Sequence, residues 1–386
     1  MTEVWVLGGT GRSGRAIATA LRQRGIDPVL VGRDAERLKA LAGDLRTVGP
    51  DPAAGEGGGQ RTVKAGSGAN NAGGLRIVVA GSVAETADAI RRDRPAVVVN
   101  TICPFLETAE PILAACLPSS HYLDLANDLA AVGALLGRDA ELAAAGRTAV
   151  TGAGFGVTAT ESVVVKLCEG RPTPRRVRVD MIPSLASEAG LVGDALAGTI
   201  VEGIPGVPGG GRFQGRRYRD GRLAPAPLGG DPMRLVLPDG SAVTTAGMPL
   251  GELMAAQRAS GAADVLAASS EAPSSPAARA LFPVATALLN IGPLRAFARR
   301  RLAMVRTKPH PKPREHSWGH AVVDWPDGTS REGWLRVGDA QTWTATVPAE
   351  VVRRLLAGEG TPGAWTPAAL FGATLAEACG GEYRLG

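Results

Sequence analysis

The chain opens with Val4-Trp5-Val6-Leu7-Gly8-Gly9-Thr10-Gly11-Arg12-Ser13-Gly14, and this stretch decides the fold. The apolar run 4–7 predicts a buried strand, and the pattern that continues to Gly25 predicts a helix. A strand that turns sharply into a helix leaves backbone N–H groups at the helix N-terminus, where the dipole favours an anion. Glycines let the backbone approach a pyrophosphate and let the helix pack on the strand. The stretch therefore predicts a dinucleotide-binding turn.

A second apolar run, residues 28–31, ends just before Arg33. In dinucleotide-binding folds this position lies beside the adenosine ribose, where an acidic residue binds the 2′-hydroxyl and an arginine accommodates a 2′-phosphate. We therefore predict NADP(H), rather than NAD(H), as the cofactor. Two plainer interpretations stay open. The spacing Gly-x-x-Gly-x-x-Gly also suits an ordinary tight turn of an α/β protein, and Arg33 also suits a solvated charge beside Asp34.

The composition is that of a globular protein with two domains. The chain has 386 residues, of which 45% are hydrophobic and 20% are charged, and each of two domains has room for its own core. The net charge of +5 is modest and aromatic residues make up only 4%, which argues against a nucleic-acid partner. A phosphorylated cofactor accounts for the basic bias.

No targeting, membrane or metal signal stands out. No uninterrupted apolar run approaches the roughly 20 residues of a membrane helix, and the N-terminus leads directly into a strand. The four cysteines, at positions 103, 116, 168 and 379, show no metal-ligand spacing. We therefore expect a cytoplasmic protein with no membrane span and no metal site.

Strands and helices alternate through the first part of the chain. The apolar runs 4–7, 28–31, 75–80, 96–102, 121–125 and 148–151 predict six strands separated by helical patterns. This alternation is typical of a Rossmann domain with a doubly wound parallel sheet, which we place at residues 1–156. The segment at about 49–74 is dense in Gly, Ala, Pro and Asn, so we expect a flexible surface insertion there.

The rhythm changes at about residue 157. Strand patterns at 177–182, 234–237, 242–245, 321–324, 333–337 and 342–347, several of them joined by tight turns, predict a mainly antiparallel sheet. We expect an α+β substrate or dimerisation domain over 157–348, with a loop-rich stretch at 184–230. Two closing helices, 349–356 and 367–379, are expected to pack back on the Rossmann domain as a segment spanning 349–386.

Ligands of doubly wound sheets bind outside the carboxyl ends of the strands. We expect the cofactor to contact residues of the first turn and of the later strand ends, namely Gly8, Thr10, Gly11, Arg12, Ser13, Gly14, Arg33, Ser82, Asn100, Thr101, Cys103, Pro104 and Phe105. Two alternatives stay open here. Asn100 also suits a polar cap that bonds its own loop, and Phe105 also suits the core.

A reductase needs a proton donor near the cofactor. Tyr122 and Asp124 share one face of the fifth strand and are the candidates, although a structural hydrogen bond explains them equally well. Phe155 and Glu161 follow the sixth strand and are candidate substrate contacts. Glu161 also suits an acid in the first turn of a helix. The three histidines His310, His316 and His320 are interpreted as loop or rim residues.

Several motifs resemble the saccharopine dehydrogenase-like oxidoreductases. They are Gly-Gly-Thr-Gly-x-x-Gly at 8–14, Val-Asn-Thr-Ile-Cys-Pro-Phe at 99–105, His-Tyr-Leu-Asp-Leu at 121–125, Gly-Ala-Gly-Phe-Gly at 152–156 and Thr-Pro-Ala-Ala-Leu-Phe-Gly at 366–372. The resemblance is good to about residue 165, poor through the middle and good again at the C-terminus. It departs at Ala126-Asn127, where the family often has Gly-Glu, and at Ala80-Gly81-Ser82, where the family often has an acidic residue.

The resemblance implies a reductase that uses NAD(P)H on imines or on enoyl double bonds. With Arg33, it favours an NADPH-dependent reductase that delivers hydride to the C=N bond of a small biosynthetic intermediate, free or carrier-tethered. A trans-acting enoyl reductase of a polyketide- or lipid-type intermediate is the alternative enzyme. A non-catalytic NADP(H)-binding sensor or scaffold is the alternative from another class. We expect a homodimer formed through the sheet of the second domain.

Overall fold

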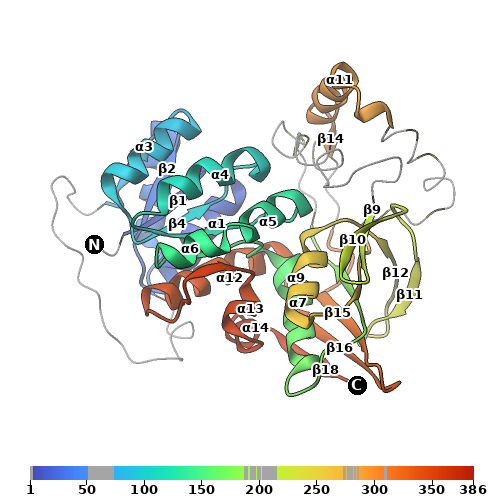
Figure 1. Cartoon of the computed structure of the whole chain (residues 1–386). Helices are drawn as coiled ribbons and strands as arrows, with labels where there is room; N and C mark the ends of the chain where they lie inside the picture. Colours follow the sequence, from blue (N-terminus) through green and yellow to red (C-terminus); the bar gives the residue numbers. More distant parts are fainter. Residues whose placement is uncertain are drawn as a thin grey trace. The chain divides into compact units, whose positions relative to one another are not determined.

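The computed structural model describes residues 3–50, 74–186, 190–191, 197, 201, 215–272, 275, 281, 284, 287–307 and 311–386. The chain divides into two compact units (Figure 1). Unit 1 comprises residues 1–125, 135–154 and 344–365, and unit 2 comprises residues 126–134, 155–343 and 366–386. The insertion expected at about 49–74 falls almost wholly outside the described residues.

Unit 1 is built on a seven-stranded sheet in which every pair of neighbours is parallel. Its strand order is β17-β6-β5-β4-β1-β2-β3. The strands are β1 (Val4–Leu7), β2 (Pro28–Gly32), β3 (Ile77–Val79), β4 (Val97–Asn100), β5 (His121–Asp124), β6 (Thr148–Val150) and β17 (Gly363–Trp365). The expected doubly wound parallel sheet is confirmed, and its order reverses between β1 and β4, which defines the ligand-binding edge.

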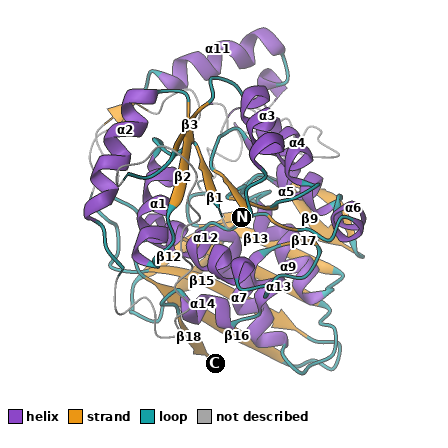
Figure 2. Ribbon diagram, turned by 90° about the vertical axis from the view of Figure 1, so that its left-hand side faces the viewer, coloured by secondary structure: helices purple, strands orange, loops and turns teal. Residues whose placement is uncertain are grey.

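Helices cover both faces of this sheet. Figure 2 shows α1 (Arg12–Gln23) and α2 (Ala35–Asp44) on one side of β1–β3, and α3 (Val83–Asp93) and α4 (Phe105–Cys116) on the other. The period-two alternation of β2 follows these layers. Leu30 packs with Leu38 and Leu41 of α2, whereas Val29 and Val31 join the core under α3 and α4. The connection after β5 contains α5 (Leu129–Leu136) and α6 (Asp139–Ala144).

The strand β17 is the main addition to the expected sheet. Its three residues pair in parallel with β6, more than 200 positions earlier in the sequence. A three-residue run inside a Gly- and Pro-containing loop has no periodicity, so only the finished edge of β6 gives it a partner.

Unit 2 contains a nine-stranded mixed sheet of order β10-β9-β13-β7-β15-β16-β18, with β12 attached to β13 and β11 to β12. The strands are β7 (Arg176–Ile182), β9 (Gly215–Arg219), β10 (Arg222–Ala226), β11 (Met233–Val236), β12 (Ala242–Gly247), β13 (Asp264–Ser269), β15 (Ser317–Asp324), β16 (Ser330–Val337) and β18 (Glu382–Leu385). Only β7 and β13 pair in parallel within it, so the expected mainly antiparallel sheet is confirmed.

The helices α7 (Phe155–Cys168) and α9 (Gly251–Ser260) pack on one face of this sheet. The packing is close at Gly319 of β15, where an added Cβ would lie 2.8 Å from the backbone of Ala159 in α7. Unit 2 also holds the pair β8 (Gly190–Leu191) and β14 (Arg306–Thr307) and the helix α11 (Gly292–Ala303). Within the part of the chain that the structure describes, no helix is long and apolar enough to cross a membrane.

Two local predictions need correction. The strand expected at 342–347 is wrong, because these residues lie in α12 (Ala340–Leu356). Asp339 accepts hydrogen bonds from the Thr342 backbone and hydroxyl and so caps this helix, and Trp343, Val347 and Val351 recur at four-residue spacing. The stretch 184–230, expected to be loop-rich, contains the β9–β10 hairpin at residues 215–226, which the sequence analysis did not predict.

The closing segment also divides differently from the expected 349–386 domain. The second expected helix is split into α13 (Pro367–Phe371) and α14 (Thr374–Ala378), and both belong to unit 2. Only residues 344–365 belong to unit 1. The reason is local, because α13 packs against α7 and hydrogen-bonds to Glu161 of that helix.

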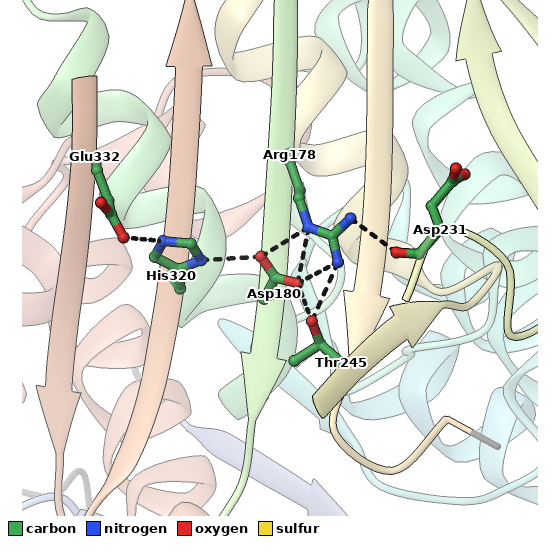
Figure 3. A network of polar contacts seen from close by, with 6 residues as sticks. All are labelled: Arg178, Asp180, Asp231, Thr245, His320 and Glu332. Carbon is green, nitrogen blue, oxygen red and sulfur yellow. Dashed lines mark hydrogen bonds and ion pairs between the residues drawn. The ribbon is translucent and has the colours of Figure 1, made fainter. Parts of the chain in front are cut away.

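A buried polar network lies on the sheet face of unit 2 that points away from α7 (Figure 3). Arg178 donates to Asp180 at 2.9 and 3.1 Å, and Thr245 donates to the same carboxylate at 2.6 Å. His320 stands with Nδ1 2.9 Å from Asp180 and Nε2 3.0 Å from Glu332. Its ring stacks on Trp334. Burial acts to raise the pKa of Asp180, but the His320 hydrogen bond and the Arg178 charge outweigh it and lower that pKa.

This network corrects the interpretation of the histidines. His320 was expected on a loop or rim, yet it lies in β15 and is fully buried. His316 is half-buried beside Glu315, and His310 lies outside the described residues. The polar partners of His320 come from β7 and β16, which only sheet pairing brings beside β15.

We expect Asp180→Asn to lower the free energy of unfolding by about 3–5 kcal/mol, because it removes the buried carboxylate that holds the Arg178 guanidinium, Thr245 and His320. The pKa of Asp180 is lower in the folded protein than in the unfolded chain, where it is near 3.8. The ionised carboxylate therefore stabilises the folded state fully above pH 3.8, and this stabilisation disappears as pH falls through the folded-state pKa. The difference between wild type and variant should shrink over the same range. Urea unfolding at several pH values measures this. The control is Asp231→Asn. Its exposed carboxylate pairs with Arg217, and its contact with Arg178 uses the backbone carbonyl, which the substitution keeps. This variant should cost less than about 1 kcal/mol.

Candidate nucleotide-binding site

The turn between β1 and α1 is built for close backbone packing. Gly8 has φ +70°, a conformation that favours glycine, and its carbonyl accepts a hydrogen bond from the Gly11 N–H at 2.8 Å. A Cβ at Gly14 would lie 2.3 Å from the Gly8 carbonyl oxygen. The first turn of α1 therefore rests directly on the glycine turn, and no larger residue fits at position 14 without a shift.

The N-terminus of α1 differs from those of the two following helices. Asp34 caps α2 by accepting from the Arg37 N–H, and Ser82 caps α3 by accepting from the Glu85 N–H. The first turn of α1 has no acidic residue, and its N-cap Gly11 makes no side-chain hydrogen bond. Gly11 and Arg12 are exposed. The N–H groups of this helix are thus open to an anion.

The end of β4 lies beside the glycine turn. The Thr101 hydroxyl donates to the Leu7 carbonyl at 2.7 Å, and a Cβ on Gly8 would lie 2.8 Å from that hydroxyl oxygen. The structure thus brings the Thr101 segment and the glycine turn together at the point where the strand order reverses. This is the edge at which doubly wound sheets bind their ligands.

Asn100 is fully buried and bonds its own surroundings. Its amide oxygen accepts from the Ile102 N–H at 3.0 Å, and its amide nitrogen donates to Thr108 and Tyr122. These contacts match the plainer interpretation, a polar cap of the loop. Phe105 is also buried, in the first turn of α4, whereas Cys103 and Pro104 are half-buried. Contact of these residues with a cofactor stays a prediction.

Ser82 has a structural task that its sequence context could have revealed. Ser82 accepts from the Glu85 N–H at 3.1 Å, and Glu85 accepts from the Gly81 N–H at 2.8 Å. The spacing Ser-x-x-Glu before a helical pattern is a capping-box signal. A cofactor contact of Ser82 stays a prediction.

Arg33 stands at the same edge as the glycine turn. Val31 of β2 lies opposite Leu7 of β1, and the Gly9 N–H donates to the Val31 carbonyl at 3.0 Å. The neighbouring Asp34 pairs with Arg37 at 3.3 Å. Arg33 itself is exposed, and within the described residues no hydrogen bond or ion pair holds it. Its guanidinium is available to a phosphate near this edge.

The two candidate proton donors form a buried pair. The Tyr122 hydroxyl donates to Asp124 at 3.0 Å, and neither side chain has exposed surface. Asp124 also accepts from the Thr151 hydroxyl at 2.7 Å and from the Gly152 N–H at 3.2 Å, which ties β5 to the turn after β6. Burial raises the pKa of Tyr122 well above its ordinary value, and the Asp124 carboxylate raises it further. These contacts show a structural pair, and proton donation by either residue stays a prediction.

The two candidate substrate contacts lie in α7 of unit 2. Phe155 is buried and meets Trp343 edge-on at 6.1 Å. Glu161 accepts hydrogen bonds from the Thr366 hydroxyl and from the N–H groups of Ala368 and Ala369. It therefore caps α13 rather than its own helix. Burial raises the pKa of Glu161 to about 7. Substrate contact stays a prediction for both residues.

Glu252 is a buried acid that sequence reasoning missed. It lies in the first turn of α9 with 1% of its surface exposed, and the Asn127 amide donates to both its oxygens at 3.0 and 3.2 Å. A Cβ on Gly156 would lie 2.0 Å from one of these oxygens. Burial raises the pKa of Glu252 to about 7. The one signal in the sequence was an acidic residue at the start of a helix, which normally indicates an exposed first turn.

We expect the stability of the protein to fall as pH rises from about 4.5 to about 7. In this window the folded state keeps protons on Glu161 and Glu252 that the unfolded chain releases, so each acid costs up to about 3 kcal/mol by pH 7. In Glu161→Gln this slope should become clearly shallower, because the variant removes one of the two acids whose pKa is raised to about 7.

Urea unfolding of the wild type and the variant at pH 5, 6, 7 and 8 measures the slope. Glu169→Gln is the control, since Glu169 is exposed at the end of the same helix and should leave the slope unchanged. An unchanged slope in Glu161→Gln would show that the carboxyl of Glu161 is ionised throughout this range.

Comparisons with known proteins support the fold. No known family model and no curated protein sequence matches this chain. Among solved structures, apo saccharopine dehydrogenase (L-Glu forming) from Saccharomyces cerevisiae matches over 100% of both chains, with a TM-score of 0.58 and 11% identity.

Short-chain dehydrogenases match over a smaller part. One from Sphingobium yanoikuyae in complex with NADPH is 18% identical, and the match covers 39% of this chain and 70% of that chain with a TM-score of 0.27. One from Streptomyces avermitilis is 15% identical, and the match covers 39% of this chain and 65% of that chain with a TM-score of 0.28. Matches at this TM-score do not establish a shared fold. The full-length match does, and the chain has a saccharopine dehydrogenase-like fold.

Proposed function

We propose that this chain is an NADPH-dependent oxidoreductase whose unit 1 binds the cofactor. The observation that carries the proposal is the open N-terminus of α1, which rests on a glycine turn at the reversal point of a parallel sheet. The helices α2 and α3 of the same sheet have side-chain caps, whereas α1 has none and leaves its first N–H groups open to an anion. The saccharopine dehydrogenase-like fold is compatible with this function.

The residues of unit 1 suit a phosphorylated dinucleotide. The N–H groups of Arg12 and Ser13 would hold the pyrophosphate, and Gly8, Gly11 and Gly14 would provide the close approach. Arg33 would hold the 2′-phosphate, with Arg12 as a second cation. Thr10, Ser82 and the β4 end, from Thr101 to Pro104, would line the remaining cofactor surface. When bound, a nicotinamide cofactor supplies the hydride.

The favoured reaction is reduction of a C=N bond in a small biosynthetic intermediate. Carbon receives the hydride and nitrogen receives a proton, so the chain must supply or conduct one proton. The Tyr122–Asp124 pair is the proposed source or positioning element, because it ends β5 beside the β4 loop in the same sheet. Phe155 and Glu161 are kept as proposed substrate-side residues, and the homodimer stays a prediction.

We expect the purified protein to bind NADPH at least tenfold more tightly than NADH, a difference of about 1.4 kcal/mol. Arg33→Ala should lose this preference, because it removes the cation that meets the 2′-phosphate. Nicotinamide fluorescence during titration measures both affinities. Arg46→Ala is the matched control, since this exposed arginine follows α2 and should not change the ratio. Equal affinity of the wild type for NADPH and NADH would show that Arg33 is a solvated surface charge with no role in cofactor choice. No binding of either nucleotide would overturn the proposed function.

Hydride transfer separates the enzyme from its alternatives. We expect deuteride from labelled NADPH to appear at the former imine carbon of a product amine, detected by mass spectrometry. Transfer to enoyl thioesters instead would identify the C=C reductase. Tight cofactor binding without transfer to either class would favour the sensor or scaffold. Tyr122→Phe should lower kcat more than it raises KM if the pair delivers the proton, and should leave NADPH affinity unchanged.

A further inference from the structure

The net positive charge of this chain arises from one segment, residues 272–314. Residues 272–314 contain nine Lys and Arg and no Asp or Glu, which leaves 33 Lys and Arg against all 37 Asp and Glu elsewhere. The net charge of +5 therefore comes entirely from this segment, and the remainder of the chain is acidic. A long stretch without a single carboxylate cannot neutralise its own arginines.

The helix α11 lies inside this segment and has no buried residue. Large apolar side chains on and beside it are exposed, with 58% of Phe297, 61% of Met304 and 49% of Ile291 accessible. Of the 13 large hydrophobic side chains that are exposed in the described part of the chain, eight lie between residues 281 and 305. Exposed apolar groups gathered in this way mark an interaction surface rather than chance exposure.

The burial pattern shows which face of α11 is turned outward. The half-buried positions 295, 298, 299 and 302 recur at helical spacing and define the inner face. Leu294, Phe297 and Arg301 are exposed at the same spacing on the outer face, followed by Met304. Arg301 lies 5.3 Å from the centre of the Phe297 ring. The outer face thus presents large apolar groups and guanidinium groups together.

We propose that α11 docks on an anionic lipid surface. Its apolar side chains would enter the boundary between headgroups and acyl chains, while long arginine stems place their charges at the phosphates. Twelve residues make a helix about 18 Å long, too short for a hydrocarbon core of about 30 Å, so the helix would lie along the surface. Nucleic acid would use the arginines but would leave Leu294, Ile291 and Met304 in water, which makes lipid the better match.

The test is co-sedimentation of the full-length protein with vesicles of phosphatidylcholine alone or with 30% phosphatidylglycerol. We expect binding to the anionic vesicles only, weakened by salt. One arginine near an anionic surface contributes about fivefold in affinity, so Arg300→Gln with Arg301→Gln should lower binding about 25-fold. Phe297→Asp should lower it at least as much, because it removes the apolar anchor and adds a negative charge.

Matched controls use other exposed residues of unit 2. The double variant Arg222→Gln with Arg331→Gln removes the same charge from β10 and β16. Val236→Asp places the same acidic group at an exposed apolar position of β11. Neither control variant should change vesicle binding more than twofold. Because α11 has no buried residue, its variants should keep the unfolding temperature and the NADPH affinity of the wild type. Equal binding by wild type and α11 variants, or binding to duplex DNA but not to vesicles, would overturn the proposal. So would a self-associated protein that the α11 variants convert to monomers.

Discussion

The contact of α1 with the glycine turn is the constraint on which the candidate site depends. A Cβ at Gly14 would come within 2.3 Å of the Gly8 carbonyl oxygen, so α1 begins as close to β1 as two backbones allow. This closeness places the first turn of α1 at the edge where the strand order reverses between the neighbours β1 and β4. Thr101 completes the edge by bonding the Leu7 carbonyl. The proposed dinucleotide binding rests on this backbone geometry, and Arg33 is the residue proposed to distinguish a phosphorylated from an unphosphorylated cofactor.

Three buried acids, Asp180, Glu161 and Glu252, differ in their hydrogen-bond partners and in the direction of their pKa shifts. The His320 hydrogen bond and the Arg178 charge lower the pKa of Asp180. Glu161 accepts from N–H groups at the start of α13 and Glu252 from the Asn127 amide, but burial outweighs these bonds and raises the pKa of both to about 7. Each of the two glutamates is buried in its neutral form, which avoids burying a charge. The cost in stability therefore grows as pH rises and the same acids ionise in the unfolded chain.

Exposed cations occur in two different settings in this chain, at the proposed cofactor site of unit 1 and around α11 of unit 2. Unit 1 has Arg12 and Arg33 exposed at one sheet edge, where each is proposed to meet a phosphate of the cofactor. The sequence of residues 272–314, the α11 segment, has nine Lys and Arg and no Asp or Glu, and its helix α11 carries exposed apolar side chains. A small phosphorylated ligand cannot cover such a surface, whereas an extended anionic layer can. The basic bias of the sequence is thus explained by the α11 segment more than by cofactor binding.

From the sequence we could predict the parallel sheet of unit 1, six of its seven strands and the glycine turn, because these depend on local periodicity. The order of the strands in the sheet came only from the structure. The sequence also predicted the hairpins β11–β12 and β15–β16, whose turns are short. Tertiary structure alone decided the partners of Glu161, Glu252 and His320, because those partners lie between 12 and 208 positions away and carry no local signal. It also decided that 342–347 is helical, since burial of one helical face outweighs the strand preference of Thr, Trp and Val. Local sequence patterns predict most helices and strands, but only the packing of these elements decides which polar groups are buried together.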